Sequence, residues 1–159
     1  MTVPRGPALK ISAGPRAAAI LRDSGFDARQ FSWLAGASGG PKWFVLYGLD
    51  RYLAGSFFHN RQIPLHMIGS SAGAWRLACY AQHDPVSALE RLAKFYSQQV
   101  YSDQPDAVEV TAEARSMLSA VLGASGAEEI SSNMMMRLHV IADRVRGPLK
   151  SDRRLPLSV

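Results

Sequence analysis

The sequence has little of what secreted and membrane-spanning proteins depend on. Cys79 is its single cysteine, so no disulfide forms within the chain and a reducing cytoplasm is the expected compartment. No apolar run approaches the ~20 residues of a membrane-spanning helix. The opening stretch, MTVPRGPALK, has no apolar core of a secretory signal. Zinc-finger spacings and aromatic-and-basic ribonucleoprotein signatures are also missing, so no nucleic-acid partner is expected.

Charged residues are scarce as well, at 19% against 47% hydrophobic residues, which excludes a disordered chain and favours a folded one. The net charge of +5 favours approach to anionic surfaces, such as phospholipid headgroups, without identifying a partner. Part of the excess positive charge lies near the end of the chain, in a cluster that we interpret as a solvated loop or tail. The cluster consists of Arg144, Arg146, Lys150, Arg153 and Arg154.

Helix and strand patterns alternate along the 159 residues, which suit a single domain. Helices are expected from Gly14-Pro15 to Gly25, over 42–53 and 72–82, from Asp84-Pro85 to about Val100, and over 111–123. Strands are expected over 31–34, 63–68 and 138–142. This order predicts a three-layer α/β fold with a mainly parallel sheet. In such sheets, ligands bind beyond the carboxyl ends of the strands.

The spelling Gly-x-Ser-x-Gly occurs twice, over 36–40 and 69–73, each time directly after a predicted strand. A serine becomes an effective nucleophile when its proton is removed and the oxyanion it creates is stabilised. A tight strand-to-helix turn presents the hydroxyl but requires glycine or very small neighbours. Gly69, Ala72 and Gly73 provide these around Ser71, so we predict that Ser71 is the nucleophile.

The first copy of the motif is better suited to stabilising charge. Gly39 and Gly40 offer consecutive backbone N–H groups, which form an anion-binding nest. Pro41 and Lys42 follow them, and 32 residues separate Gly39 from Ser71, enough for one helix and a return strand. We therefore expect Gly39 and Gly40 to form an oxyanion hole, with Lys42 adding positive potential for substrate binding.

These two segments resemble the patatin-like phospholipases. Ser38-Gly39-Gly40-Pro41-Lys42 is similar to the family's glycine-rich loop, and Gly69-Ser70-Ser71-Ala72-Gly73 to its nucleophile turn. Ser38 and Trp43 depart from the loop, at positions where the family often has glycine. The likeness covers residues 31–82 well and a later strand, 137–147, weakly. It implies a patatin-type fold and hydrolysis of lipid or phospholipid acyl esters, without a metal or cofactor.

The resemblance also implies a serine–aspartate dyad, with the aspartate in an Asp-Gly turn. No Asp-Gly dipeptide occurs in the chain, and nothing marks Asp143 or Asp152 as the base. We therefore expect an incomplete patatin-like sheet: a single domain over 1–159, truncated before the dyad aspartate and a poor hydrolase when isolated. The protein is expected in the cytoplasm, with peripheral contact to an anionic membrane surface and the oligomeric state left open.

Three alternatives remain. An α/β-hydrolase triad would pair Ser71 with a histidine, and His139 is the one well downstream, although its alternation places it inside a strand. Nucleotide binding would use GASGGPKW, yet Pro41 removes a donor and Trp43 replaces the magnesium-binding hydroxyl. A non-catalytic lipid-binding or interaction module would explain the missing base.

Two further residues lie on the helix after Ser71. Arg76 either pins this helix or meets an anionic headgroup, and Cys79 is expected to be buried as a packing residue.

Overall fold

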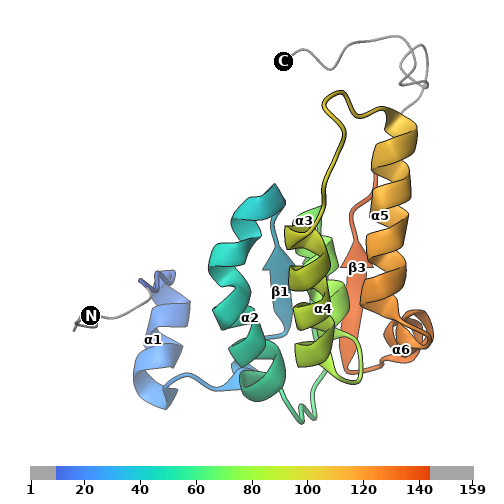
Figure 1. Ribbon diagram of the computed structural model, residues 1–159. Coiled ribbons are helices and arrows are strands. Elements are labelled where there is room, and N and C mark those ends of the chain that lie inside the picture. Colours follow the sequence, from blue (N-terminus) through green and yellow to red (C-terminus); the bar gives the residue numbers. More distant parts are fainter. Residues whose placement is uncertain (1–9, 144–159) are drawn as a thin grey trace, which may run out of the picture.

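Three parallel strands form the sheet at the centre of the computed structural model, which describes residues 10–143 (Figure 1). The basic cluster Arg144–Arg154 and Asp152 lie outside the described residues. The elements in chain order are α1 (Pro15–Ser24), η1 (Ala28–Gln30), β1 (Trp33–Gly36), η2 (Gly40–Leu46), α2 (Tyr47–Tyr52), η3 (Leu53–Phe57), β2 (Leu65–Gly69), α3 (Ala72–Tyr80), α4 (Pro85–Ser97), α5 (Ala107–Leu122), α6 (Gly126–Ser132) and β3 (Met136–Val140).

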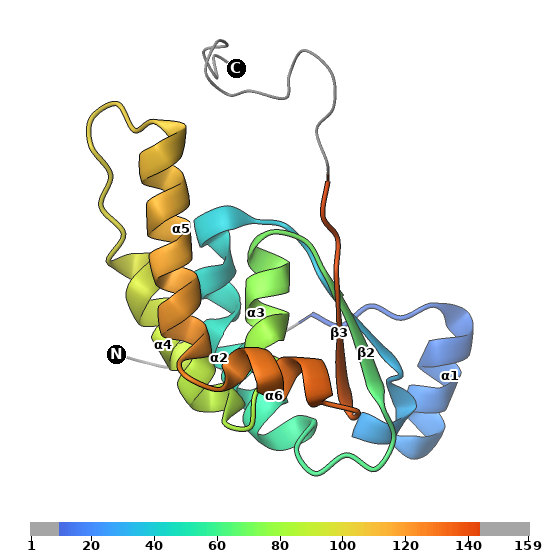
Figure 2. The ribbon, with the colours of Figure 1, turned by 90° about the vertical axis from the view of Figure 1, so that its right-hand side faces the viewer.

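The sheet has the order β1-β2-β3, and both strand pairs are parallel, which confirms the predicted α/β class and parallel sheet. Helices α2 to α6 lie on one side of it, and α1 lies on the other (Figure 2). The second side is thinly covered, since Trp33 is 57% exposed and no residue of α1 is buried. In the described residues, helices therefore cover one face of the sheet more completely than the other. None of the described helices is long and apolar enough to cross a membrane.

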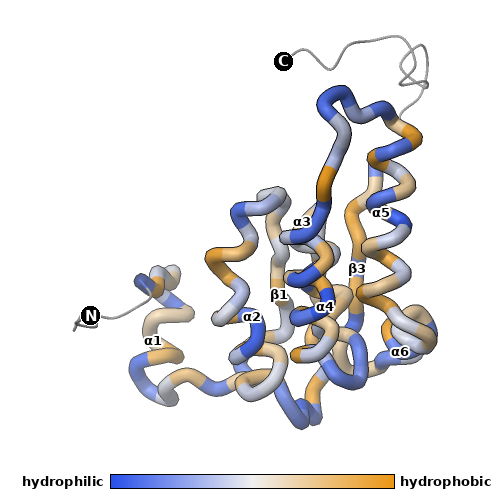
Figure 3. Tube along the Cα trace, viewed as in Figure 1, coloured by the Kyte–Doolittle hydropathy of each residue, from blue (hydrophilic) through white to orange (hydrophobic). Residues whose placement is uncertain are grey.

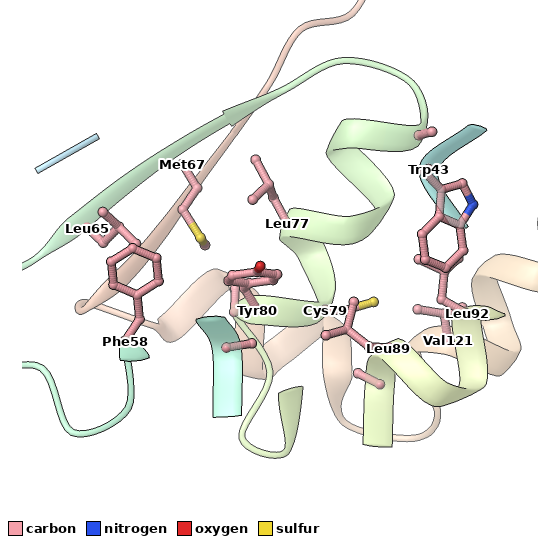
Figure 4. Packing of buried hydrophobic residues seen from close by; sticks show 14 of the residues in the cluster. Trp43, Phe58, Leu65, Met67, Leu77, Cys79, Tyr80, Leu89, Leu92 and Val121 are labelled. Atoms are coloured by element: carbon pink, nitrogen blue, oxygen red, sulfur yellow. The ribbon is translucent and has the colours of Figure 1, made fainter. Parts of the chain in front are cut away.

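The core lies between β2 and the helices on the better-covered side. Leu65 and Met67 of β2 are fully buried; Met67 points toward Leu77 and Tyr80 of α3, and Leu65 lies beside Phe58 (Figure 4). Along α5, hydrophobic and hydrophilic positions alternate (Figure 3), and its buried residues Met117 and Val121 belong to this core. Burial of the period-3.6 apolar face is what attaches these helices to the sheet.

Helix starts follow capping residues in the sequence. Asp84 accepts a hydrogen bond from the Ser87 N–H at 3.0 Å, and α4 begins at the predicted proline. Helix α5 begins at Ala107, four residues before the prediction, because the Asp106 carboxylate accepts the Glu109 N–H at 2.8 Å. The helix predicted over 42–53 is instead three consecutive segments, a 3₁₀ turn (η2), α2 and a π-helical turn (η3). Helix α6 was not predicted.

The strands lie one to two residues from their predicted bounds, for reasons visible in their hydrogen bonds. The Phe31 carbonyl accepts from the Arg61 guanidinium at 2.7 Å, which occupies it outside the sheet, and β1 starts at Trp33. Arg61 also donates to the carbonyl of Ala28, so it fixes the approach to β1 from 30 residues away. In β3, the Met136 N–H donates to the Asn133 side chain at 2.8 Å, and the strand begins there.

Candidate active site

The two Gly-x-Ser-x-Gly turns lie side by side at the carboxyl edge of the sheet. Gly36 at the end of β1 is the register partner of Gly69 at the end of β2. The Ser70 N–H donates to the Gly36 carbonyl at 3.2 Å, so the ladder continues into the second turn. The predicted neighbourhood of the two turns is therefore present in the structure.

Ser71 occupies the tip of the second turn, immediately before α3. Its side chain is exposed, and its backbone has φ +50° and ψ −127°. A positive φ is strained for any residue with a Cβ, and such strain persists where the surroundings enforce it. Among residues 10–143, Asn60 is the other non-glycine residue with this property. The turn thus holds an exposed Ser71 in a strained backbone conformation.

The glycines around Ser71 are required because the backbones approach too closely for a side chain. A Cβ added to Gly69 would lie 2.7 Å from the Ala74 backbone nitrogen. A Cβ added to Gly73 would lie 2.0 Å from the carbonyl oxygen of Gly36. The second contact joins the two turns directly, so both glycines set the position of Ser71 relative to β1 and its loop.

The loop after β1 carries two backbone N–H groups without a partner. In the described part of the chain, no hydrogen bond uses the N–H of Gly39 or Gly40, and both residues are half-buried. Gly40 has φ +49°, whereas Gly39 has φ −170°, which any residue adopts. The glycine preference is therefore a backbone requirement at Gly40 alone. Two unpaired donors in the loop that neighbours the Ser71 turn are suited to binding an oxyanion.

The residues after this loop anchor it and exclude the nucleotide-binding arrangement. Trp43 is buried, stacks on Phe44 at 4.5 Å between ring centroids, and meets the Tyr96 ring edge-on at 5.8 Å. An indole held in the core does not replace the hydroxyl that ligates magnesium in a phosphate loop. Lys42 is exposed at the surface beside the loop, where its charge faces solvent.

A buried ion pair fixes α3 to α2 one turn beyond Ser71. The Arg76 guanidinium donates two hydrogen bonds to the Asp50 carboxylate, at 2.7 and 2.6 Å, and the Tyr80 hydroxyl donates a third at 2.9 Å. Burial acts to lower the pKa of Arg76, but the hydrogen bonds and charge of Asp50 outweigh it, and the pKa is raised. Burial, followed by the charge of Asp50, raises the pKa of Tyr80. Arg76 therefore pins its helix.

No motif points to Asp50, which is 0% exposed. The signal that would have found it is a single acidic residue in the mostly apolar stretch 42–53, because buried charges require partners. Cys79, by contrast, is buried as predicted, and burial raises the pKa of its thiol to about 12. A thiol in this state is not a nucleophile.

No described residue stands as a general base for Ser71. Within residues 10–143, its hydroxyl makes no hydrogen bond to any side chain, and no group of three or more metal-binding side chains gathers. His139 lies on the thinly covered side of the sheet, where its Nε2 is 3.0 Å from His66 Nδ1. Trp33 is beside both imidazoles, with its ring centroid 4.7 Å from His66 and 5.4 Å from His139. This placement does not favour the triad.

No protein-family model matches the chain, and searches of curated proteins and of solved structures found no significant match. The resemblance to patatin-like phospholipases thus depends on the two glycine-rich segments themselves. What the structure adds is their arrangement, with adjacent parallel strands ending in the two turns.

Proposed function

We propose that the chain is a lipid acyl hydrolase of patatin-like type, with Ser71 as its nucleophile. One observation carries this proposal: the turn that holds a strained, exposed serine contacts the end of β1, where a glycine loop with unpaired N–H donors begins. Strained backbone conformations at strand-to-helix turns cluster at functional sites. Neither turn alone supports the proposal as strongly as their contact through Gly73 and Gly36.

The reaction follows from the roles of these groups. The Ser71 Oγ attacks the ester carbonyl, and the carbonyl oxygen becomes an anion held by the N–H groups of Gly39 and Gly40. The positive end of the α3 dipole favours the same charge. The alkoxide of the substrate leaves with a proton, and water then cleaves the acyl-enzyme to a fatty acid and free Ser71. In this scheme the serine proton passes to the dyad aspartate that the resemblance to patatin-like phospholipases implies.

Contact with a lipid surface is part of the proposal. Lys42 is exposed on η2, and Val45 of the same segment is 85% exposed. An apolar side chain beside a cation suits the boundary between anionic headgroups and acyl chains. Both residues belong to the segment that follows the glycine loop, so this contact would present the site to ester bonds in a membrane surface from the cytoplasmic side.

A fluorophosphonate probe tests the proposed nucleophile, because it phosphonylates activated serines and needs no turnover. The folded protein is incubated with the probe, and the labelled residue is identified by mass spectrometry. Labelling should be lost in Ser71→Ala and retained in Ser38→Ala, which removes the matching hydroxyl of the other turn. Labelling that persists in Ser71→Ala, with the modification on another residue, contradicts the proposal.

A second candidate is a non-catalytic lipid-binding module, and it is favoured by a specific observation. The Ser71 hydroxyl has no hydrogen-bonded base among residues 10–143, and a lone serine reacts slowly. A folded protein that binds phospholipid vesicles but is never labelled at any serine would support this candidate. The variant His139→Ala tests the histidine triad. If Ser71 is labelled as fast in this variant as in the unmodified protein, the His139 imidazole is not its base.

A further inference from the structure

An apolar groove runs along the side of α3 that faces away from α2. Its volume is about 350 Å³, within the ~300–1,000 Å³ range of small-molecule sites. Residues of α3, α5, α6 and β3 form its walls, and α6 lies at the foot of α5 (Figure 1). Ser131 supplies the one hydroxyl among the described lining residues, which otherwise include Ala74, Ala78, Leu118, Ile130 and Val140.

The upper end of the groove is next to the proposed nucleophile. Ala74 and Trp75 line it and belong to the first turn of α3, whose preceding residue is Ser71. The Trp75 backbone N–H donates to the Ser71 carbonyl at 3.2 Å, so Trp75 lies one helical turn from the nucleophile turn. Val140, on the opposite wall, is the register partner of Gly69. The groove therefore begins within one helical turn of Ser71, on the wall that α3 forms.

The walls of the groove contain no charge among the described residues. Small side chains line the α3 side, at Ala74 and Ala78, and Ala127 lines the α6 side. Alanines leave room between the helices where larger residues would fill the space. The groove is thus apolar and begins at the first turn of α3, features that suit a hydrocarbon chain and not a polar headgroup.

We infer that this groove holds the fatty acyl chain of the substrate, with the carbonyl at Ser71 and the chain end near Ala127. The inference rests on the proposed function. It adds the path of the acyl chain, a preference for long chains, and Ala127 as the residue that limits chain length. Long acyl chains are preferred over short ones, because each buried methylene improves binding about fourfold. The headgroup remains on the solvent side, toward Lys42.

Two fluorophosphonates that differ only in chain length test the inference, one with a methyl group and one with a dodecyl group. The readout is the rate of phosphonylation of Ser71, followed by intact mass. We expect the dodecyl probe to react roughly tenfold faster or more. Ala78→Phe, which fills the middle of the groove, should remove this advantage and leave the methyl rate unchanged. Ala19→Phe, on the exposed surface of α1, is the matched control and should change neither rate.

Ala127→Phe provides a second variant, at an exposed position where a larger side chain does not disturb the core. It should retain reaction with an octyl probe and slow the dodecyl probe. Melting temperatures establish that each variant is folded. Equal methyl and dodecyl rates at Ser71, or equal slowing of both by Ala78→Phe, would overturn the groove assignment and leave the proposed function standing.

The remaining outcomes separate the two claims. If Ser71 reacts with neither probe, the proposed function fails, and the acyl groove fails with it. If the protein forms a dimer that blocks the dodecyl probe and that Ala78→Phe dissociates, the groove belongs to a second copy of the chain, and the inference is overturned. Sedimentation at two concentrations distinguishes this case from a monomer.

Discussion

Gly73 of α3 packs directly on Gly36 of β1, so closely that a Cβ on Gly73 would lie 2.0 Å from the Gly36 carbonyl oxygen. The obstacle is backbone on both sides, so no side-chain rotation relieves it. Ser71 is two residues away, and the loop with Gly39 and Gly40 starts at Gly36. This single contact therefore sets the distance between the two turns of the candidate site.

Gly73→Ala should lower the free energy of unfolding by about 1–3 kcal/mol or more, because an overpacked site must shift backbone. Gly48→Ala is the matched control, since its Cβ meets nothing within 4 Å and the residue lies within α2. That change should stabilise by about 0.5–1 kcal/mol through helix propensity. Urea unfolding measures both, and similar free energies for the two variants would contradict the close packing.

Ser71 is strained by its positive φ, so removal of its Cβ should release energy. We expect Ser71→Gly to be more stable to unfolding than Ser71→Ala by about 1 kcal/mol, since alanine keeps the strain and glycine does not. Both variants remove the hydroxyl, which makes them a matched pair. Thermal melts compare them. An alanine variant as stable as the glycine variant would show that the turn is relaxed.

Removing one partner of the Arg76–Asp50 ion pair should lower the free energy of unfolding more than replacing both partners. Arg76→Met leaves a buried, unpaired carboxylate and should cost about 3–5 kcal/mol of unfolding free energy. Tyr80→Phe removes one hydrogen bond from a carboxylate that remains paired, and should cost about 1 kcal/mol. The double variant Asp50→Leu/Arg76→Met should recover most of the first loss. No recovery in the double variant would argue against a buried pair.

The cap of α4 predicts a dependence of stability on pH. Hydrogen bonds from the Ser87 hydroxyl and the Ser87 N–H lower the pKa of Asp84 below its usual 3.8. The unfolded chain therefore binds the proton more readily, and the stabilisation present above pH 3.8 is lost as the pH falls through the folded-state pKa. Asp84→Asn keeps a capping oxygen without the titration. Unfolding measured between pH 2 and 5 should be flatter for this variant, and parallel curves would contradict the cap.

Much of this fold was predictable from the sequence because its signals are local. Pro15, Asp84-Pro85 and Gly25 mark helix ends by their own chemistry, and each ends or begins a helix in the structure. The two glycine turns follow short apolar strands, which was enough to predict parallel neighbours. A catalytic or binding role stays a prediction for each of the site residues, Ser71, Gly39, Gly40 and Lys42.

What could not be predicted depends on contacts between distant residues. Arg61 binds carbonyls near β1, and Asp50 meets Arg76 26 residues later. Helix α6 is seven residues long and polar at its surface, and part of its position comes from Glu129, which accepts the His83 N–H at 2.8 Å. The His66–His139 contact joins β2 and β3, and no sequence pattern predicts that these two strands are neighbours. Each of these is a tertiary interaction whose partner residue no local pattern predicts.

The central claim is that Ser71 and the Gly39–Gly40 loop act on the same oxygen atom. A crystal structure of the protein after reaction with a fluorophosphonate measures this directly. We predict a phosphonyl group on the Ser71 Oγ, with its oxygen about 2.7–3.1 Å from the backbone nitrogens of Gly39 and Gly40. A phosphonyl oxygen directed to solvent, with both glycine N–H groups left unpaired, would contradict the account.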